Sequence, residues 1–186
     1  MPPKQRFNHD LILKKAYNMF TEGGMEAVNA RSVSKALQCS TQPIFSYFPD
    51  MGGLRAALIE KGYEDFTAIM KKAEEEGGSI LARCLAYEQF AAEQPNVFLF
   101  LIGNHPLNKD EKPGKILFTL PEEILRAEAE RLQAGEDAVQ WLQHELCVYA
   151  HGAATLLALR NTGADAEALA KATGELYTVL ADQLGK

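Results

Sequence analysis

The most constraining feature of this chain is the spacing of its apolar residues, which repeats with the period of an α-helix along almost the whole sequence. Ile12, Ala16, Met19 and Phe20, for example, stand at positions i, i+4, i+7 and i+8 and share one helix face. No window shows the sustained alternation of apolar and polar residues that is typical of a half-buried β-strand. The sequence therefore predicts an all-α fold.

Capping residues, glycines and prolines divide this pattern into separate helices. Asn29 is placed to cap a short helix ending near Leu37, and Ser40 or Thr41 to cap another, which must end before Pro49. Asp50 is placed to cap a longer helix over 51–76, and Ser79 to restart a helix over 79–91. Further helices are predicted over 96–103, 122–132, 137–160 and 166–184, and the proline-containing segment 104–121 is predicted to be a loop. We therefore expect a domain of three short helices over 1–50, followed by a helical bundle over 51–186.

Composition sets the class of protein. The chain has 186 residues, 47% of them hydrophobic, which is enough to bury a core. No apolar run approaches the roughly 20 residues that span a bilayer, and the N-terminal residues lack a signal-peptide apolar stretch, so we expect a cytoplasmic protein without a membrane partner. Three cysteines without a Cys-x-x-Cys pair (Cys39, Cys84 and Cys147) are expected to be free thiols.

Charge is unevenly distributed along the chain. Residues 1–50 carry six basic and four acidic groups, a net +2, whereas the remainder carries 13 basic and 21 acidic groups, a net −8. Any contact with phosphate is therefore expected in the N-terminal segment. An excess of this size permits DNA binding without showing it.

The two short helices over 30–37 and 41–47, with a tight turn at 38–40, match a helix-turn-helix in length. Val33, Leu37 and Ile44 would hold the pair together, and the second helix opens on small polar residues. The major groove of B-DNA admits one such helix, whose N-terminal side chains reach the base edges. Because short amphipathic helices more often serve only for packing, this pattern alone leaves DNA binding open.

Residues 12–54 resemble the N-terminal domain of TetR-family (tetracycline-repressor-like) transcriptional regulators in the order and spacing of their residues. The matching residues are Ile12-Leu13, Ala16, Met19-Phe20, Gly24, Val28-Asn29, Arg31, Val33, Ala36, Ser40, Ile44-Phe45, Tyr47-Phe48-Pro49 and Leu54. The C-terminal part is similar to one class of ligand-binding domain in that family, which carries a His-Gly motif. Its matching residues are Tyr87, Phe90-Ala91, Pro95, Tyr149, His151-Gly152-Ala153-Ala154 and Leu156.

The resemblance implies an N-terminal three-helix helix-turn-helix domain followed by a helical-bundle domain for ligand binding and dimerisation. The function that it implies is a regulator, in our reading a repressor, that a small apolar or aromatic effector releases from an inverted-repeat operator in double-stranded DNA. The residues at or near DNA would be Arg31, Thr41, Gln42, Pro43, Ser46 and Tyr47, with Lys4 and Arg6 as a basic arm.

The family resemblance also implies a homodimer built from the last two helices. Small residues along them would allow a close approach of the two copies, and larger apolar residues would supply contact area. The residues expected at this interface are Gly152, Ala153, Leu156, Ala170, Gly174, Tyr177 and Leu180.

Three residues depart from the family pattern in the DNA-binding segment. Gln38 stands where the family has a turn glycine, and a positive φ there would be unfavourable by about 1 kcal/mol. Phe45 replaces the usual tyrosine, and Met51 replaces a lysine that would contact phosphate. We therefore expect DNA binding weaker than is typical of the family.

A candidate ligand site follows from the helix over 137–160. Helical spacing places Trp141, His144, Cys147, Val148 and His151 on one face, and aromatic and sulfur-containing side chains of other helices could oppose them. Such a cavity suits a mostly apolar small molecule, although a plain packed core has the same composition. The expected ligand-binding residues are Phe66, Met70, Cys84, Tyr87, Phe98, Trp141, His144, Cys147 and His151.

Other functions remain as alternatives. His144, Cys147, His151 and Cys84 are possible zinc ligands, but they lack the tight pairs of most structural zinc sites, so we expect neither a metal nor another cofactor. The sequence has no Gly-rich phosphate loop, no Gly-x-Ser-x-Gly and no paired carboxylate in an apolar setting, which argues against an enzyme. A helical adaptor that binds protein, or a metal or redox sensor with weakened DNA binding, stays open because of Gln38 and Met51.

Overall fold

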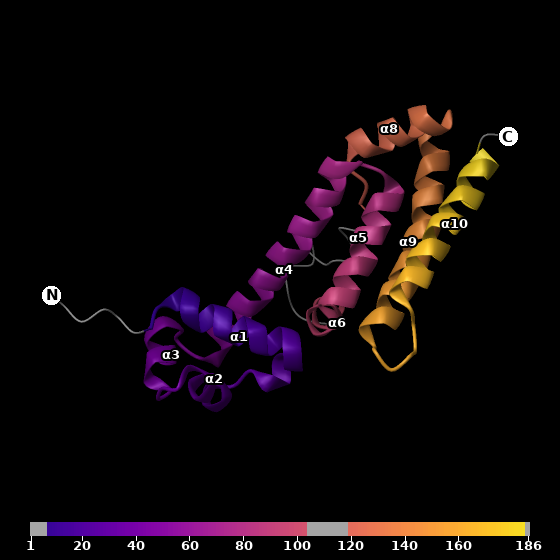
Figure 1. The fold of residues 1–186 in the computed structure, drawn as a ribbon. Helices are drawn as coiled ribbons and strands as arrows, with labels where there is room; N and C mark the ends of the chain where they lie inside the picture. Colours follow the sequence, from indigo (N-terminus) through magenta and orange to yellow (C-terminus); the bar gives the residue numbers. More distant parts are fainter. Residues whose placement is uncertain (1–6, 104–118, 185–186) are drawn as a thin grey trace. The chain divides into compact units, whose positions relative to one another are not determined.

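A computed structural model of the chain describes residues 7–103 and 119–184, and over these residues it is helical with no strand (Figure 1). The predicted all-α class is thus confirmed. The chain divides into two compact units, Met1–Glu64 and Asp65–Lys186, and the boundary lies inside α4. The helices are α1 (His9–Gly23), the 3-10 turn η1 (Met25–Ala27), α2 (Ala30–Leu37), α3 (Gln42–Tyr47), α4 (Met51–Glu76), α5 (Ile80–Glu93), α6 (Pro95–Ile102), α8 (Glu122–Leu132), α9 (Glu136–Ala158) and α10 (Ala166–Leu184).

The first unit is built on α1, which packs against η1 and α2. The side chain of Asn8 caps α1 by accepting a hydrogen bond of 2.8 Å from the backbone N–H of Leu11. The helix ends where Gly24 adopts a φ of 75°, a conformation that favours glycine. The fully buried side chains of this unit are mostly aliphatic, so hydrophobic burial is its main source of stability: Ile12, Ala16, Phe20, Val28, Val33, Ile44, Leu54 and Leu58.

Capping contacts define the ends of α2 and α4 as the sequence predicts. The Asn29 side chain accepts from the Ser32 N–H, and the Ser32 hydroxyl accepts from the Asn29 N–H, which forms a reciprocal capping box at α2. Asp50 accepts from the Gly53 N–H at the start of α4. At α3 the expected side-chain cap is absent: Thr41 occupies the capping position, but its side chain makes no capping hydrogen bond. Pro43 lies in the first turn, where its fixed φ suits the start of a helix.

In the second unit α9 and α10 lie side by side as an antiparallel pair, and α5 packs against both (Figure 1). Ser79 caps α5 by accepting a hydrogen bond from the Ala82 N–H. α6 begins at Pro95, whose fixed φ suits the first turn of a helix. The core between these helices is mainly aromatic and aliphatic: Phe66, Tyr87, Phe90, Phe98, Leu101, Val139, Leu142, Leu146 and Ala150.

A buried carboxylate joins three parts of the second unit. Glu128 of α8 is 2% exposed, and it accepts hydrogen bonds from the Ile80 N–H at the start of α5 and from the Tyr177 hydroxyl of α10. Arg131 pairs with the same carboxylate and lies 5.4 Å from the Tyr177 ring centroid. Glu128 therefore fixes α8 against the start of α5, through Ile80, and against α10, through Tyr177.

Candidate functional site

The exposed side of α3 is the first candidate site. Ile44 and Phe48 are buried in the core of the first unit, whereas Thr41, Gln42 and Ser46 are exposed. The Ser46 hydroxyl donates back to the Gln42 carbonyl within the helix. The side of α3 that faces away from the core therefore carries short polar groups able to donate and accept hydrogen bonds.

The charge of this region favours an anionic partner. Between Ala30 and Tyr47 the chain contains two basic residues, Arg31 and Lys35, and no acidic residue. Both basic side chains are exposed on α2. The predicted basic arm, Lys4 and Arg6, lies outside the described residues.

Phe45 adds an apolar element to the same surface. Its side chain is 44% exposed on α3, although a phenylalanine is ordinarily buried in a small domain. Sequence reasoning treated this position only as a lost tyrosine hydroxyl. In the structure it is an exposed ring next to Gln42 and Ser46, as the helical spacing of positions 42, 45 and 46 requires.

Tyr47 differs from the other residues expected to face DNA. Its ring is half-buried, and its hydroxyl donates a hydrogen bond of 2.9 Å to the backbone carbonyl of Phe7. The tyrosine therefore fixes the chain just before α1, and the proton of its hydroxyl is used in this contact within the unit. Pro43 is also half-buried and acts mainly in starting α3.

The turn between α2 and α3 contains Gln38, which stands where the TetR-family pattern has a glycine. Gln38 has φ 53° and ψ 47°, the left-handed conformation, and ends α2. Its N–H and that of Cys39 bond to the carbonyls of Lys35 and Ser34. A glutamine in this conformation is less favourable than a glycine by roughly 1 kcal/mol, so the turn keeps its shape at that cost.

The second candidate site is a buried aromatic cluster in the second unit. Tyr87 lies at its centre, with ring centroids 5.8 Å from Phe66 and 5.2 Å from Phe98, both in edge-to-face geometry. Phe90 completes the cluster at 5.3 Å from Phe66. Met70 is buried in the same unit, so the structure buries these four of the expected ligand-binding residues, Phe66, Met70, Tyr87 and Phe98, in the core.

Polar contacts connect this cluster to α9. The Tyr87 hydroxyl lies 2.8 Å from Nδ1 of His151, and one turn away the sulfurs of Cys84 and Cys147 lie 4.0 Å apart. Burial, and to a lesser degree the nearby Cys147, raises the pKa of the Tyr87 phenol. The phenol therefore keeps its proton and can donate a hydrogen bond to Nδ1 of the His151 imidazole.

Trp141 and His144 do not join this cluster, contrary to expectation. Both are exposed, Trp141 by 42%, while Leu142, Gln143 and Leu146 form the buried face of α9. Helical spacing predicts that Trp141 and His144 share one face of α9 with Cys147, Val148 and His151. In the structure only part of that face is buried: Cys147 is buried and His151 is half-buried. Trp141, expected among the ligand-binding residues, therefore lies outside the aromatic cluster.

Two buried charged residues of α5 were missed from the sequence. Arg83 is 3% exposed, pairs with Glu74 of α4 and donates to the carbonyl of Thr119 at 3.0 Å. Glu88 is 2% exposed and accepts a hydrogen bond of 2.6 Å from the Thr173 hydroxyl of α10. Burial raises the pKa of Glu88, and the Thr173 bond opposes that effect. Glu88 follows Cys84 by one turn on an apolar face, and that was the available signal.

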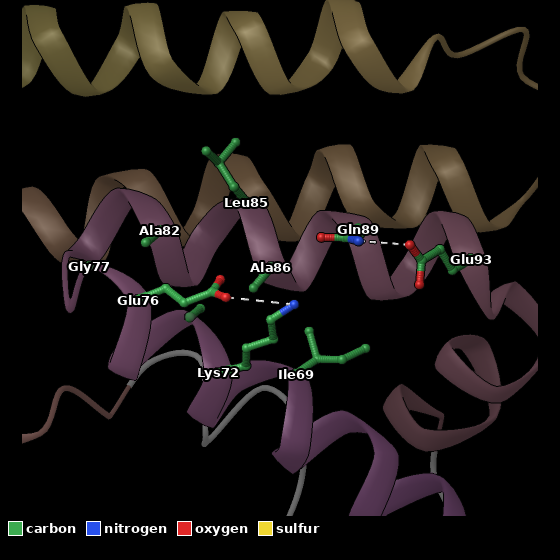
Figure 2. A pocket seen from close by; sticks show the side chains of 10 residues that line it. Ile69, Lys72, Glu76, Gly77, Ala82, Leu85, Ala86, Gln89 and Glu93 are labelled. Atoms are coloured by element: carbon green, nitrogen blue, oxygen red, sulfur yellow. Dashed lines mark hydrogen bonds and ion pairs between the residues drawn. The ribbon is translucent and has the colours of Figure 1, made fainter.

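Two hollows on the described surface of the second unit are not lined by the aromatic cluster. One of about 480 Å³ lies between α4 and α5, where Lys72 pairs with Glu76 and Gln89 donates to Glu93 beside the apolar Ile69 (Figure 2). The other, of about 370 Å³, is lined by Thr119, Leu120, Leu125, Gln140, Gln143 and His144.

The residues expected at a dimer interface separate into two groups. Gly152 and Leu156 of α9 are exposed and Ala170 and Gly174 of α10 are partly exposed, and a Cβ atom added to either glycine would meet no neighbour within 4 Å. In contrast, three of the expected interface residues pack inside their own unit, where their apolar area is already used: Ala153, Tyr177 and Leu180.

Comparison with protein-family models and with curated proteins finds no match to this chain. Among the described residues, no group of three or more His, Cys, Asp or Glu side chains is arranged to hold a metal ion. None of the described helices is both long enough and apolar enough to cross a membrane.

Proposed function

We propose that this chain is a DNA-binding transcriptional regulator of the TetR type, in which the first unit binds an operator and the second unit responds to a small molecule. The observation that carries the proposal is the exposed side of α3. Its polar side chains and the exposed Arg31 and Lys35 of α2 belong to a segment, residues 30–47, that contains no acidic residue. The two short helices of this segment are joined by a turn at which Gln38 ends α2.

The contacts proposed for DNA follow from the chemistry of these side chains. Arg31 and Lys35 would contact phosphates, which fixes the register of the protein on the duplex. Thr41, Gln42 and Ser46 would reach base edges, and an amide such as that of Gln42 can pair with adenine. The exposed ring of Phe45 supplies apolar contact, for which the thymine methyl group is the matching partner in the major groove.

The proposed assembly is a two-fold dimer through α9 and α10. On α9, Trp141, Val148, Gly152 and Leu156 form an exposed apolar stripe at helical spacing, and Val179 of α10 is 55% exposed. Contiguous exposed apolar surface is typical of an interface. The two glycines leave open space that a second copy would fill.

The proposed effector is apolar or aromatic and binds where Tyr87 and His151 meet the aromatic cluster. Because this cluster is closely packed, the ligand would have to separate α5 from α9 or displace side chains there. Linkage requires that it bind the DNA-free form more tightly, and such couplings typically amount to about 1–3 kcal/mol. The polar pair of Tyr87 and His151 would orient a ligand that carries one polar group.

DNA binding is tested by a gel shift of the full chain with the DNA upstream of its own gene, repeated over a range of salt concentrations. Affinity should fall steeply as salt rises, and the bound site should be an inverted repeat with half-sites roughly 34–36 Å apart or a multiple of that spacing. A Thr41→Ala, Gln42→Ala variant should bind about 1–3 kcal/mol more weakly. Thr41 makes no capping bond, so this change should leave the fold intact.

The matched control is Asn18→Ala, an exposed polar residue late in α1 of the same unit. It should bind as the unmodified chain does. Normal affinity in the Thr41→Ala, Gln42→Ala variant would remove the proposed reading surface. A folded dimer that binds none of the upstream DNA would favour the protein-binding adaptor instead.

Assembly is tested separately by light scattering at micromolar concentration. The unmodified chain should be a dimer, and Leu156→Glu should produce a monomer because it places a charge in the apolar stripe. Arg126→Glu on the exposed side of α8 serves as the control and should remain dimeric. A monomeric unmodified chain would contradict the proposed dimer without bearing on DNA contact by α3.

A further inference from the structure

The second unit brings together two thiols that are far apart in the sequence. Cys84 of α5 and Cys147 of α9 are separated by 63 residues, and their sulfur atoms lie 4.0 Å apart. Both side chains are buried, at 0% and 1% exposure. The third cysteine, Cys39, belongs to the other unit. The chain therefore contains one thiol pair within reach of a covalent link and one separate thiol.

The surroundings of the two thiols make them chemically unequal. The hydrogen bond from Cys84, together with the positive charge of Arg83, lowers the pKa of Cys147, although burial acts in the opposite direction. The same bond and burial raise the pKa of Cys84. Cys147 therefore ionises more readily to the thiolate, which is the reactive form of a cysteine, and Cys84 remains a protonated thiol beside it.

A hollow in the surface lies one helical turn along α9 from Cys147. The hollow of about 370 Å³ is lined by Gln143 and His144, and Gln143 precedes Cys147 by one helical turn. Thr119, another residue of its wall, accepts the hydrogen bond from Arg83. This hollow is large enough to admit a molecule the size of hydrogen peroxide, and its wall includes the residue one helical turn before Cys147.

We propose that Cys84 and Cys147 form a redox-reactive dithiol, which a peroxide converts into a disulfide joining α5 to α9. The Cys147 thiolate attacks one oxygen of hydrogen peroxide, the O–O bond breaks, and a sulfenic acid forms. The departing hydroxide takes up the proton that the Cys147 thiol released on ionising, which gives one water molecule. The Cys84 sulfur then attacks the sulfenic sulfur, and a second water molecule leaves as the S–S bond forms. The peroxide is reduced by two electrons and the two thiols are oxidised, so the step balances.

The geometry requires only a small local movement. A disulfide has an S–S distance of roughly 2.05 Å, so the sulfurs must approach by about 2 Å, which side-chain rotation and a slight shift of the helices can provide. The link would hold α5 against α9 beside the contact of Tyr87 with His151. This property belongs to the second unit alone and does not rest on DNA binding.

The test uses the reduced full chain treated with hydrogen peroxide in native buffer and then analysed by intact mass and by peptide mapping without reductant. The expected result is a loss of two hydrogen atoms in mass, a linked pair of peptides containing Cys84 and Cys147, and a free thiol at Cys39. A thiol reductant should restore the original mass. The oxidised chain should melt at a higher temperature, because a link between distant residues constrains the unfolded chain.

Three variants complete the test. Cys39→Ser should form the disulfide as the unmodified chain does, whereas Cys84→Ser and Cys147→Ser should each lose it. A disulfide through Cys39, over-oxidation of Cys147 with Cys84 still free, or three unchanged thiols in the unmodified chain would each overturn the proposal. Peptide mapping of the unmodified chain decides the matter even if a core variant does not fold. Failure here would leave the proposed DNA contact untouched.

Discussion

The two units of this chain differ most in what they bury. Among the described residues of the first unit, Ser34 is the one buried polar residue, and the other buried residues are apolar. The second unit buries three charged side chains (Arg83, Glu88 and Glu128) as well as Gln143 and Thr173. A core of the first kind holds one arrangement largely independent of pH, whereas buried ionisable groups make the second unit sensitive to protonation and to polar ligands.

This difference fits the roles proposed for the two units, in which the first unit binds DNA and the second unit responds to a small molecule. The first unit places polar side chains of α3 on its surface above an apolar core, which suits a rigid binding surface. In the second unit, by contrast, the ionisable and reactive groups lie inside, between α5, α9 and α10.

Replacing Glu128 with alanine should destabilise the second unit by about 2–4 kcal/mol. The change leaves the buried Ile80 N–H and Tyr177 hydroxyl without their acceptor and removes the partner of Arg131. Urea unfolding followed by circular dichroism measures the loss. Glu130→Ala, an exposed change on the same helix, should alter stability by less than roughly 0.5 kcal/mol. Equal effects of the two changes would show that Glu128 does not hold α8 in place.

Replacing Glu88 with glutamine should change how stability depends on pH. Burial raises the pKa of Glu88 in the folded chain, so its favourable contribution is complete below its unfolded pKa of about 4.3 and is lost as pH rises through the folded value. At pH 8 the charged carboxylate includes one oxygen, Oε2, without a hydrogen-bond partner among the described residues. Relative to the unmodified chain, Glu88→Gln should therefore become progressively more stable as the pH rises from 4 to 8.

Urea titrations at several pH values between 4 and 8 measure this gain. The control is Glu93→Gln on the exposed end of the same helix, which should leave the pH dependence unchanged. A stability difference that is the same at every pH would mean that folding does not shift the pKa of Glu88, and the contrast between the two cores would lose its main support.

The two units should respond alike where they share a backbone feature. Gln38 ends α2 with φ 53° and Gln133 ends α8 with φ 51°, both left-handed. Gln38→Gly and Gln133→Gly should each stabilise the chain by about 0.5–1 kcal/mol, since glycine adopts this conformation without steric penalty. Thermal unfolding measures the gain. Ala127→Gly inside α8 should instead destabilise by about 1 kcal/mol, and stabilisation there would contradict the explanation.

The last expected effect concerns the N-terminal end of the first unit. Tyr47→Phe removes the hydrogen bond from the hydroxyl to the Phe7 carbonyl and should lower stability by about 0.5–1.5 kcal/mol. Limited proteolysis should cut the chain before α1 faster than in the unmodified protein. Because the ring remains, DNA affinity at α3 itself should change little. A tenfold loss of affinity with unchanged proteolysis would instead indicate that the hydroxyl contacts DNA.

Much of the fold could be predicted from local chemistry. Asn29, Asp50 and Ser79 cap helices where the sequence places them, since a side-chain oxygen acts on backbone groups only a few residues away. The site in the second unit was less predictable. Helical spacing defines a sector of a helix, but which part of α9 is buried depends on how α5 and α10 lie against it, so Trp141 and His144 were wrongly grouped with Cys147.

The sequence by itself determined the helical class, most helix ends and the polar, acid-free character of the segment containing α2 and α3, because periodicity, capping and charge are local properties. Only the tertiary structure decided which side chains meet. The contacts of Cys84 with Cys147, of Tyr87 with His151 and of Glu88 with Thr173 each join helices distant in the chain. Such contacts depend on the packing of whole helices, whose rotation about their axes no local pattern specifies.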